Sequence, residues 1–97
     1  MKNIKFVPKH IIIHFHDQLI QTYGGRPGIR DRKLLDSAIE QSKTTYEGEY
    51  LHDSLIKMAA AYGYHLCNNH PFMDGNKRIA LVTMDIFIQK NGYEIDK

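Results

Sequence analysis

The sequence predicts a mainly α-helical fold, a small bundle with a possible short β-hairpin flap. Apolar residues recur three or four positions apart in four separate segments, which is the spacing of one helix face. Breaks rich in glycine and asparagine separate these segments, and β-forming residues gather in one stretch, residues 43–52. A length of 97 residues suits one core, so we expect a single domain over residues 1–97.

The first helix is predicted from Pro8 to Tyr23. Proline suits the first turn of a helix, and the pair Gly24-Gly25 ends the pattern. The expected inner face consists of Ile12, Phe15, Leu19 and Tyr23.

Three histidines in this segment raise the question of a metal site. His10 and His14 are four apart and share a face, but Ile11 stands where a zinc-protease helix carries its glutamate. Neither a carboxylate nor a cysteine nearby completes a ligand set. We therefore interpret His10, His14 and His16 as exposed or half-buried helical side chains.

The segment after the first helix is rich in turn residues. Arg26 and Arg30 flank a Pro-Gly pair, and the Gly-Lys-Ser/Thr ending of a phosphate-binding P-loop is absent. We expect a solvated loop, with partner binding as the alternative. Asp31 is a good N-cap for a second helix. The apolar stripe of that helix consists of Leu34, Leu35, Ala38 and Ile39.

Residues 43–52 surround Gly48 with β-forming side chains, which fits a small hairpin or an extended flap and equally a surface loop. A third helix is expected over residues 53–69, capped by Asp53, with an inner face of Leu55, Ala59, Tyr62 and Leu66. A fourth, over residues 76–91, is apolar enough to be central and ends at Asn91-Gly92. Its stripe consists of Ile79, Val82, Ile86 and Phe87, widened by Leu81 and Ile88.

The loop between the last two helices contains more polar groups than a connector needs. Turn and cap residues at 74–76 predict a helix start, which puts Lys77 and Arg78 in its first turn. Cations are unfavourable there, because a helix N-terminus carries about half a positive charge. An anion such as phosphate would explain them, since free N–H groups at helix N-termini bind phosphate.

Two further side chains in this loop suggest chemistry. Asp74 offers a hard oxygen ligand for Mg²⁺, and His70 can exchange a proton near neutral pH. Gly75 would let a ligand approach the backbone. Phe72 is expected to be a buried anchor. The sequence therefore favours a nucleotide phosphate site with a general base at its rim. In the alternative, Asp74 is only a helix cap, Lys77 and Arg78 form a solvated first turn, and His70 is an ordinary loop residue.

These residues resemble the signature of the Fic/Doc superfamily, most closely its Doc (death-on-curing) branch. Residues 70–78 read His-Pro-Phe-Met-Asp-Gly-Asn-Lys-Arg, where typical Fic enzymes carry His-Pro-Phe-x-x-Gly-Asn-Gly-Arg. Lys77 replaces their second glycine, as in Doc, although Doc has alanine in place of Gly75. Flanking matches are Tyr-Gly-Gly-Arg-Pro-Gly-Ile-Arg-Asp at 23–31, Leu-Leu-Asp-Ser-Ala at 34–38 and Asn-Gly-Tyr at 91–93. In Fic-like proteins a flap such as 43–52 lies beside the active site.

The resemblance implies roles for the motif residues. His70 would accept the proton of a target hydroxyl, and Asp74 would help hold Mg²⁺ or orient the acceptor. Gly75 and Asn76 would contribute to an anion hole. The residues implied to bind the ATP–Mg²⁺ cofactor are Asp74, Gly75, Asn76, Lys77 and Arg78.

By the same resemblance the chain is a toxin of a toxin–antitoxin system. It would transfer the γ-phosphate of ATP to a protein hydroxyl, that of elongation factor Tu in Doc, inhibit translation, and be restrained by a Phd-type antitoxin. Fic enzymes with glycine in place of Lys77 mostly transfer AMP, so AMP transfer is the first alternative. An inactive binding module is the second, because Doc proteins run longer than this chain and Leu81 replaces a further arginine of Fic proteins.

Composition limits the other classes of function. Hydrophobic residues make up 42% and charged residues 25%, as in an ordinary soluble globular protein. A net charge of +2 is too weak to indicate nucleic-acid binding, so none is expected. Membrane-spanning runs and a signal peptide are absent, and Cys67 is a lone cysteine, so we expect a cytoplasmic protein. The target protein, the antitoxin and the oligomeric state are beyond the sequence.

Overall fold

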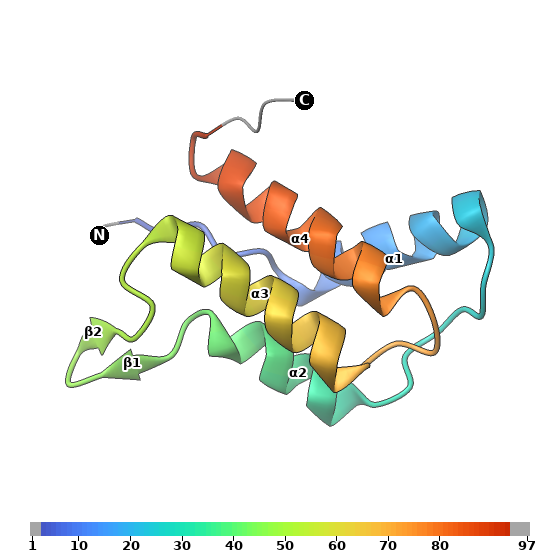
Figure 1. Cartoon of the computed structure of the whole chain (residues 1–97), viewed down its shortest axis with the longest axis horizontal. Helices are drawn as coiled ribbons and strands as arrows, with labels where there is room; N and C mark the ends of the chain where they lie inside the picture. Colours follow the sequence, from blue (N-terminus) through green and yellow to red (C-terminus); the bar gives the residue numbers. More distant parts are fainter. Residues whose placement is uncertain (1–2, 94–97) are drawn as a thin grey trace.

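A computed structural model of the chain describes residues 3–93. This part of the chain is a mainly α-helical bundle with a small β-hairpin, which confirms the predicted fold class (Figure 1). Its elements are α1 (Lys9–Tyr23), α2 (Arg32–Gln41), β1 (Thr45–Tyr46), β2 (Glu49–Tyr50), α3 (Leu55–Asn69) and α4 (Asn76–Lys90). None of the described helices is long and apolar enough to cross a membrane.

Helices α3 and α4 form the centre of the bundle. They run antiparallel on either side of the connecting loop, with α2 packed against α3 and α1 packed against α4 (Figure 1). Gly63 in α3 permits a close approach of the two helices, because a Cβ there would collide with Met84 Sδ on α4. The loop between α3 and α4 is therefore supported by two tightly packed helices.

The core collects one side chain or more from every helix and from the N-terminal segment. The largest fully buried apolar side chains are Val7, Ile12, Leu35, Met58, Tyr62, Leu66, Phe72, Ile79 and Phe87. Tyr62 is buried with its hydroxyl oxygen accepting the Val7 N–H at 3.0 Å, and this burial raises the pKa of Tyr62 to about 12. The α4 stripe is buried at Ile79 and Phe87, and the expected widening is confirmed at Ile88. Leu81 is 62% exposed, so the expected widening of the buried face there is wrong.

The helix ends agree with local capping signals in most places. Asp31 caps α2 as predicted, since its carboxylate accepts the Leu34 N–H at 3.0 Å. The predicted cap of α3 is wrong: Ser54 Oγ accepts the Lys57 N–H at 3.1 Å. Asp53 lies one residue too early for that bond and instead pairs with the Lys57 side chain at 2.9 Å. Pro8 lies at the N-cap of α1, just outside the first turn.

The predicted hairpin is present over β1 and β2, with Thr45 opposite Tyr50 and Glu47-Gly48 at the turn. However, β2 leads into the N-terminus of α3, whereas the motif loop follows its C-terminus (Figure 1). Fifteen helical residues separate the two, a length of about 22 Å at 1.5 Å per residue. The expectation that the hairpin lies beside the motif loop is therefore wrong for this chain.

Candidate active site

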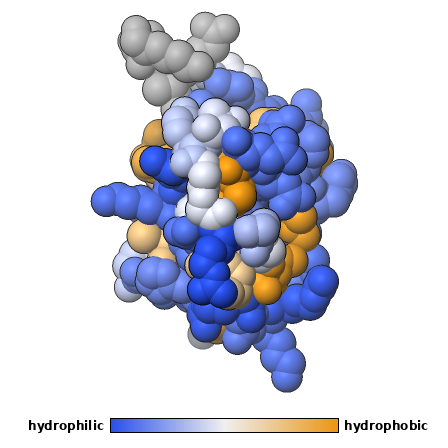
Figure 2. Space-filling model, turned by 90° about the vertical axis from the view of Figure 1, so that its right-hand side faces the viewer, coloured by the Kyte–Doolittle hydropathy of each residue, from blue (hydrophilic) through white to orange (hydrophobic). Residues whose placement is uncertain are grey.

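The candidate site occupies the end of the bundle where α3 turns into α4. His70, Asp74, Lys77 and Arg78 are all exposed at this end, and Gly75 is half-buried among them. Figure 2 shows this end of the molecule as a mostly hydrophilic surface, with apolar patches between the polar residues. The structure thus gathers the predicted residues where a polar ligand can reach them.

Phe72 anchors the loop to the core, as predicted. Its side chain is 1% exposed and stacks on the imidazole of His16, with ring centroids 3.8 Å apart and an interplanar angle of 12°. Asn76 closes the loop over this anchor. Its Oδ1 accepts the Phe72 N–H at 2.9 Å, and its Nδ2 donates to the Phe72 carbonyl at 3.0 Å. The Asn76 side chain therefore fixes the loop. An anion would then be bound by backbone N–H groups in the first turn of α4.

The N-terminus of α4 has no side-chain cap within residues 3–93. Gly75 is the N-cap, in a left-handed conformation with φ of 73°, and its carbonyl accepts the Ile79 N–H at 3.0 Å. The expectation that Asp74 or Asn76 would supply a capping side chain is wrong, because both side chains bond to other backbone groups. N–H groups in the first turn of α4 consequently remain available to an anion.

Asp74 is held by the backbone on both sides of its carboxylate. Arg26 N–H donates to Oδ2 at 3.2 Å, and Gly75 N–H donates to Oδ1 at 3.0 Å. These two bonds, with smaller contributions from the charges of Arg26 and Arg78, hold the pKa of Asp74 below its ordinary value. Gly25 has a φ of 113°, which favours glycine, and a Cβ there would lie 2.9 Å from Asp74 Oδ2. Asp74 is therefore an oriented carboxylate anion with lone pairs left for a further ligand.

The two cations of the first turn have no carboxylate partner within the part of the chain that the structure describes. Arg78 instead lies over the ring of Tyr23, with its guanidinium carbon 4.5 Å from the ring centroid. Beside this pair is a cavity of about 240 Å³ between α1 and α4. The residues that line the cavity are Leu19, Ile20, Tyr23, Gly24, Gly25, Asp74, Gly75 and Arg78.

The Gly-rich segment before α2 holds the motif loop from outside. Arg30 and Asp31 N–H groups both donate to the Pro71 carbonyl, at 2.7 and 3.0 Å, and Met73 N–H donates to the Gly28 carbonyl at 3.0 Å. The expectation of a merely solvated loop is therefore wrong for residues 28–31. Arg26 and Arg30 remain exposed, as a solvated loop requires.

The sequence analysis also missed the role of His16. It is fully buried, whereas His10 and His14 are exposed as expected. Its Nε2 lies 2.7 Å from the Asp74 carbonyl oxygen, and since a carbonyl only accepts, Nε2 carries the hydrogen. The signal was its place four residues after the buried Ile12, on the same face of α1.

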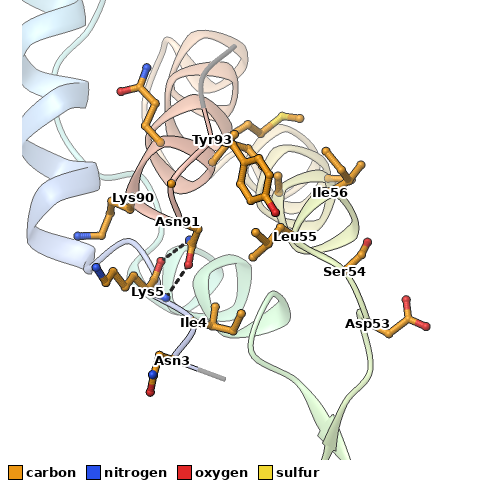
Figure 3. Close-up of a pocket in the computed structure, with 16 residues that line it drawn as sticks. Asn3, Ile4, Lys5, Asp53, Ser54, Leu55, Ile56, Lys90, Asn91 and Tyr93 are labelled. Atoms are coloured by element: carbon orange, nitrogen blue, oxygen red, sulfur yellow. Dashed lines mark hydrogen bonds between the residues drawn. The ribbon is translucent and has the colours of Figure 1, made fainter. Parts of the chain in front are cut away.

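A larger cavity lies at the opposite end of the α3–α4 pair. It measures about 1160 Å³ and is lined mainly by apolar side chains, among them Ile4, Leu55 and Ile56 (Figure 3). Groups of three or more potential metal ligands are absent there and elsewhere in residues 3–93.

A family model described as Fic/DOC matches residues 6–88, which include every residue of the candidate site. The chain belongs to the Fic/Doc family. It is 32% identical over 84 residues to "Protein kinase doc" of Escherichia phage P1, a match that covers 87% of this chain and 66% of that protein. It is 36% identical over 73 residues to "Toxin Doc" of Mycolicibacterium smegmatis, covering 75% of this chain and 56% of that protein. The chain thus matches less than two thirds of the length of both Doc relatives.

Proposed function

We propose that this chain is a Doc-like toxin that transfers the γ-phosphate of ATP to a hydroxyl group of a target protein. The observation that carries the proposal is the N-terminus of α4, which has no side-chain cap among residues 3–93. Lys77 and Arg78 lie there without carboxylate partners in the same part of the chain, and the exposed His70 is close in sequence. The names of the two relatives, a protein kinase and a toxin, support the same reading.

In the proposed reaction, the His70 imidazole takes the proton of the target hydroxyl as its oxygen bonds to the γ-phosphorus. The bond between that phosphorus and the bridging oxygen breaks, and ADP leaves. Phosphates would bind to the first-turn N–H groups of α4 and to Lys77 and Arg78. The remainder of the catalysis is positioning and charge stabilisation, which the braced loop suits.

The residues present fit a magnesium ion held together with the nucleotide. Asp74 offers one ionised carboxylate with free lone pairs, and Mg²⁺ commonly uses one or two carboxylates together with substrate phosphates and water. When bound, the ion would neutralise phosphate charge. By resemblance, the target is elongation factor Tu, the effect is inhibition of translation, and the restraining partner is a Phd-type antitoxin.

The test compares ATP labelled at the γ-phosphate with ATP labelled at the α-phosphate, using the purified protein in a cell lysate. Label reaching a protein from the γ position alone is the expected result. Replacing His70 with alanine should lower the rate about 10²- to 10⁴-fold, the usual contribution of a general base. The matched control is His10→Ala, which removes an exposed histidine of α1 far along the chain from the motif.

AMP transfer is the second candidate, because Pro71 and Gly75 match the Fic form of the motif. Label arriving only from the α-phosphate would reject the kinase reading and favour this one. Binding of an antitoxin-like peptide, without transfer of either label, would favour a binding module instead.

A further inference from the structure

The inference concerns the backbone of His70 and rests on the proposed function. His70 ends α3 in the left-handed region, with φ of 46° and ψ of 53°. Residues with a Cβ adopt this region rarely, because the Cβ approaches the following carbonyl oxygen. Something outside the helix must therefore favour this conformation at the candidate base.

Arg30 provides contacts of that kind. Its Nε donates to the His70 carbonyl at 2.6 Å, and its Nη2 donates to the Asn69 carbonyl at 3.0 Å. Its own backbone N–H donates to the Pro71 carbonyl at 2.7 Å. Three successive carbonyls, before, at and after the turn, are thus bound by a single residue 40 positions away.

The chemistry of a guanidinium bound to two carbonyls explains why arginine suits this place. The last carbonyls of a helix lack intrahelical partners and carry a partial negative charge. A guanidinium presents adjacent N–H groups in one rigid plane, so two carbonyls fix both its position and theirs. Lysine would supply the charge without that fork.

One other long-range bond acts next to His70, because Asn69 Nδ2 donates to the Leu34 carbonyl at 3.0 Å. The remaining contacts of the loop act at later residues. Asn76 and the buried ring hold Phe72, and Gly28 holds Met73. Among the described residues, Arg30 is the only one whose side chain bonds to the His70 carbonyl. Because that side chain is exposed, truncating it leaves no buried cavity, and water can replace its hydrogen bonds.

We propose that Arg30 is a positioning residue that holds the His70 backbone in the orientation needed for phosphate transfer. Arg30→Ala should lower kcat about 10- to 100-fold, in line with the cost of misplacing a reacting group. KM for ATP should change less than about twofold, because the phosphate-binding groups on α4 are untouched. Arg30→Lys should recover part of the loss.

The matched control is Arg32→Ala. Arg32 is an exposed arginine two residues away, at the start of α2, with no side-chain hydrogen bond among the described residues. It should leave kcat within about twofold of the parent protein, as expected for a surface change. Thermal unfolding of all three variants shows whether each is folded under the assay conditions.

A second readout does not depend on activity. The backbone Cα chemical shift and the HN–Hα coupling of His70 report its φ, and both should move in Arg30→Ala while those of Arg32→Ala stay. If the parent protein transfers no phosphate, the proposed function fails, and these signals alone decide the role of Arg30. The proposal would be overturned if the His70 signals were unchanged or if folded Arg30→Ala kept its kcat. It would also be overturned if the loss of activity only matched the fraction of unfolded protein.

Discussion

An asparagine fastens each end of α4, and the two ends use the same chemistry for different tasks. At the first residue, Asn76 accepts from the Phe72 N–H and donates to the Phe72 carbonyl, at 2.9 and 3.0 Å. At the C-cap, Asn91 does the same with Lys5, at 3.0 Å in both directions (Figure 3). Asn91 also donates to the Phe87 carbonyl at 2.8 Å.

The difference lies in what each asparagine holds. Asn76 binds the backbone of the buried Phe72, four positions away, and thereby shapes the candidate site. Asn91 binds an exposed residue 86 positions away and holds the N-terminal segment against the bundle. The same pair of hydrogen bonds should therefore affect activity at one end of α4 and only stability at the other.

The largest effect is expected from Phe72→Ala. Removing a buried aromatic side chain should lower the free energy of unfolding by about 3–5 kcal/mol. Its counterpart at the other end is Phe6→Ala, which should cost less because Phe6 is only half-buried. Urea denaturation of both variants gives the comparison. Equal losses would show that the motif loop is no better anchored than the N-terminal segment.

Asn76→Ala should follow. It leaves two partly buried backbone groups of Phe72 unpaired, at about 1–3 kcal/mol for each unsatisfied group. Phosphate transfer should fall by more than the loss of folded protein explains. Urea denaturation and the γ-label assay measure the two effects. Asn76→Asp serves as a control that keeps the acceptor and removes the donor.

Asn91→Ala should have a smaller effect, about 0.5–1.5 kcal/mol, because water can replace the exposed bonds to Lys5. Transfer per folded molecule should stay unchanged. The same two assays measure it. A fall in transfer equal to that of Asn76→Ala would remove the proposed distinction between the two ends.

The smallest effect is the pH dependence of stability from Asp74. Backbone N–H groups of Arg26 and Gly75 lower the pKa of Asp74 below its ordinary value. Because the folded pKa is the lower one, the contribution is full above the unfolded pKa and is lost as pH falls through the folded pKa. Asp74→Asn should therefore weaken the acid dependence of the urea midpoint below about pH 4.

The counterpart at the far end is Asp53, whose pKa is lowered chiefly by the hydrogen bond from the Lys57 side chain. Asp53→Asn should weaken the acid dependence in the same direction. High salt should reduce the Asp53 effect more, because a charged side chain supplies its main partner and backbone N–H groups supply those of Asp74. An Asp74 effect that salt abolished would contradict this assignment.

Sequence alone predicted the features that depend on nearby residues. Helical spacing located the four helices, and Asp31 capped α2 as its position indicates. Phe72 was expected to be an anchor and is one. The Asp53 error is of the same local kind, since Asp53 and Ser54 are both good N-caps and only the backbone geometry decides between them.

The features that the sequence did not predict depend on distant partners. Arg30 and His16 act on the loop 40 and 58 residues along the chain. A buried histidine and an exposed one look alike in sequence, because burial follows from how α1 meets the loop. Tyr23 fits the helical spacing, yet it is 62% exposed because α1 extends past the core there. The roles assigned to the site residues remain predictions.

The contacts made by residues 26–31 and by His16 have a consequence for how the chain folds during synthesis. On a ribosome these residues emerge before the signature motif. The motif loop would therefore take its final shape only after α4 has left the exit tunnel and docked. For protein engineering, the motif loop depends in the same way on residues 26–31 and on His16. The helix pair α3–α4 grafted alone onto a foreign scaffold would therefore not keep the shape of its loop.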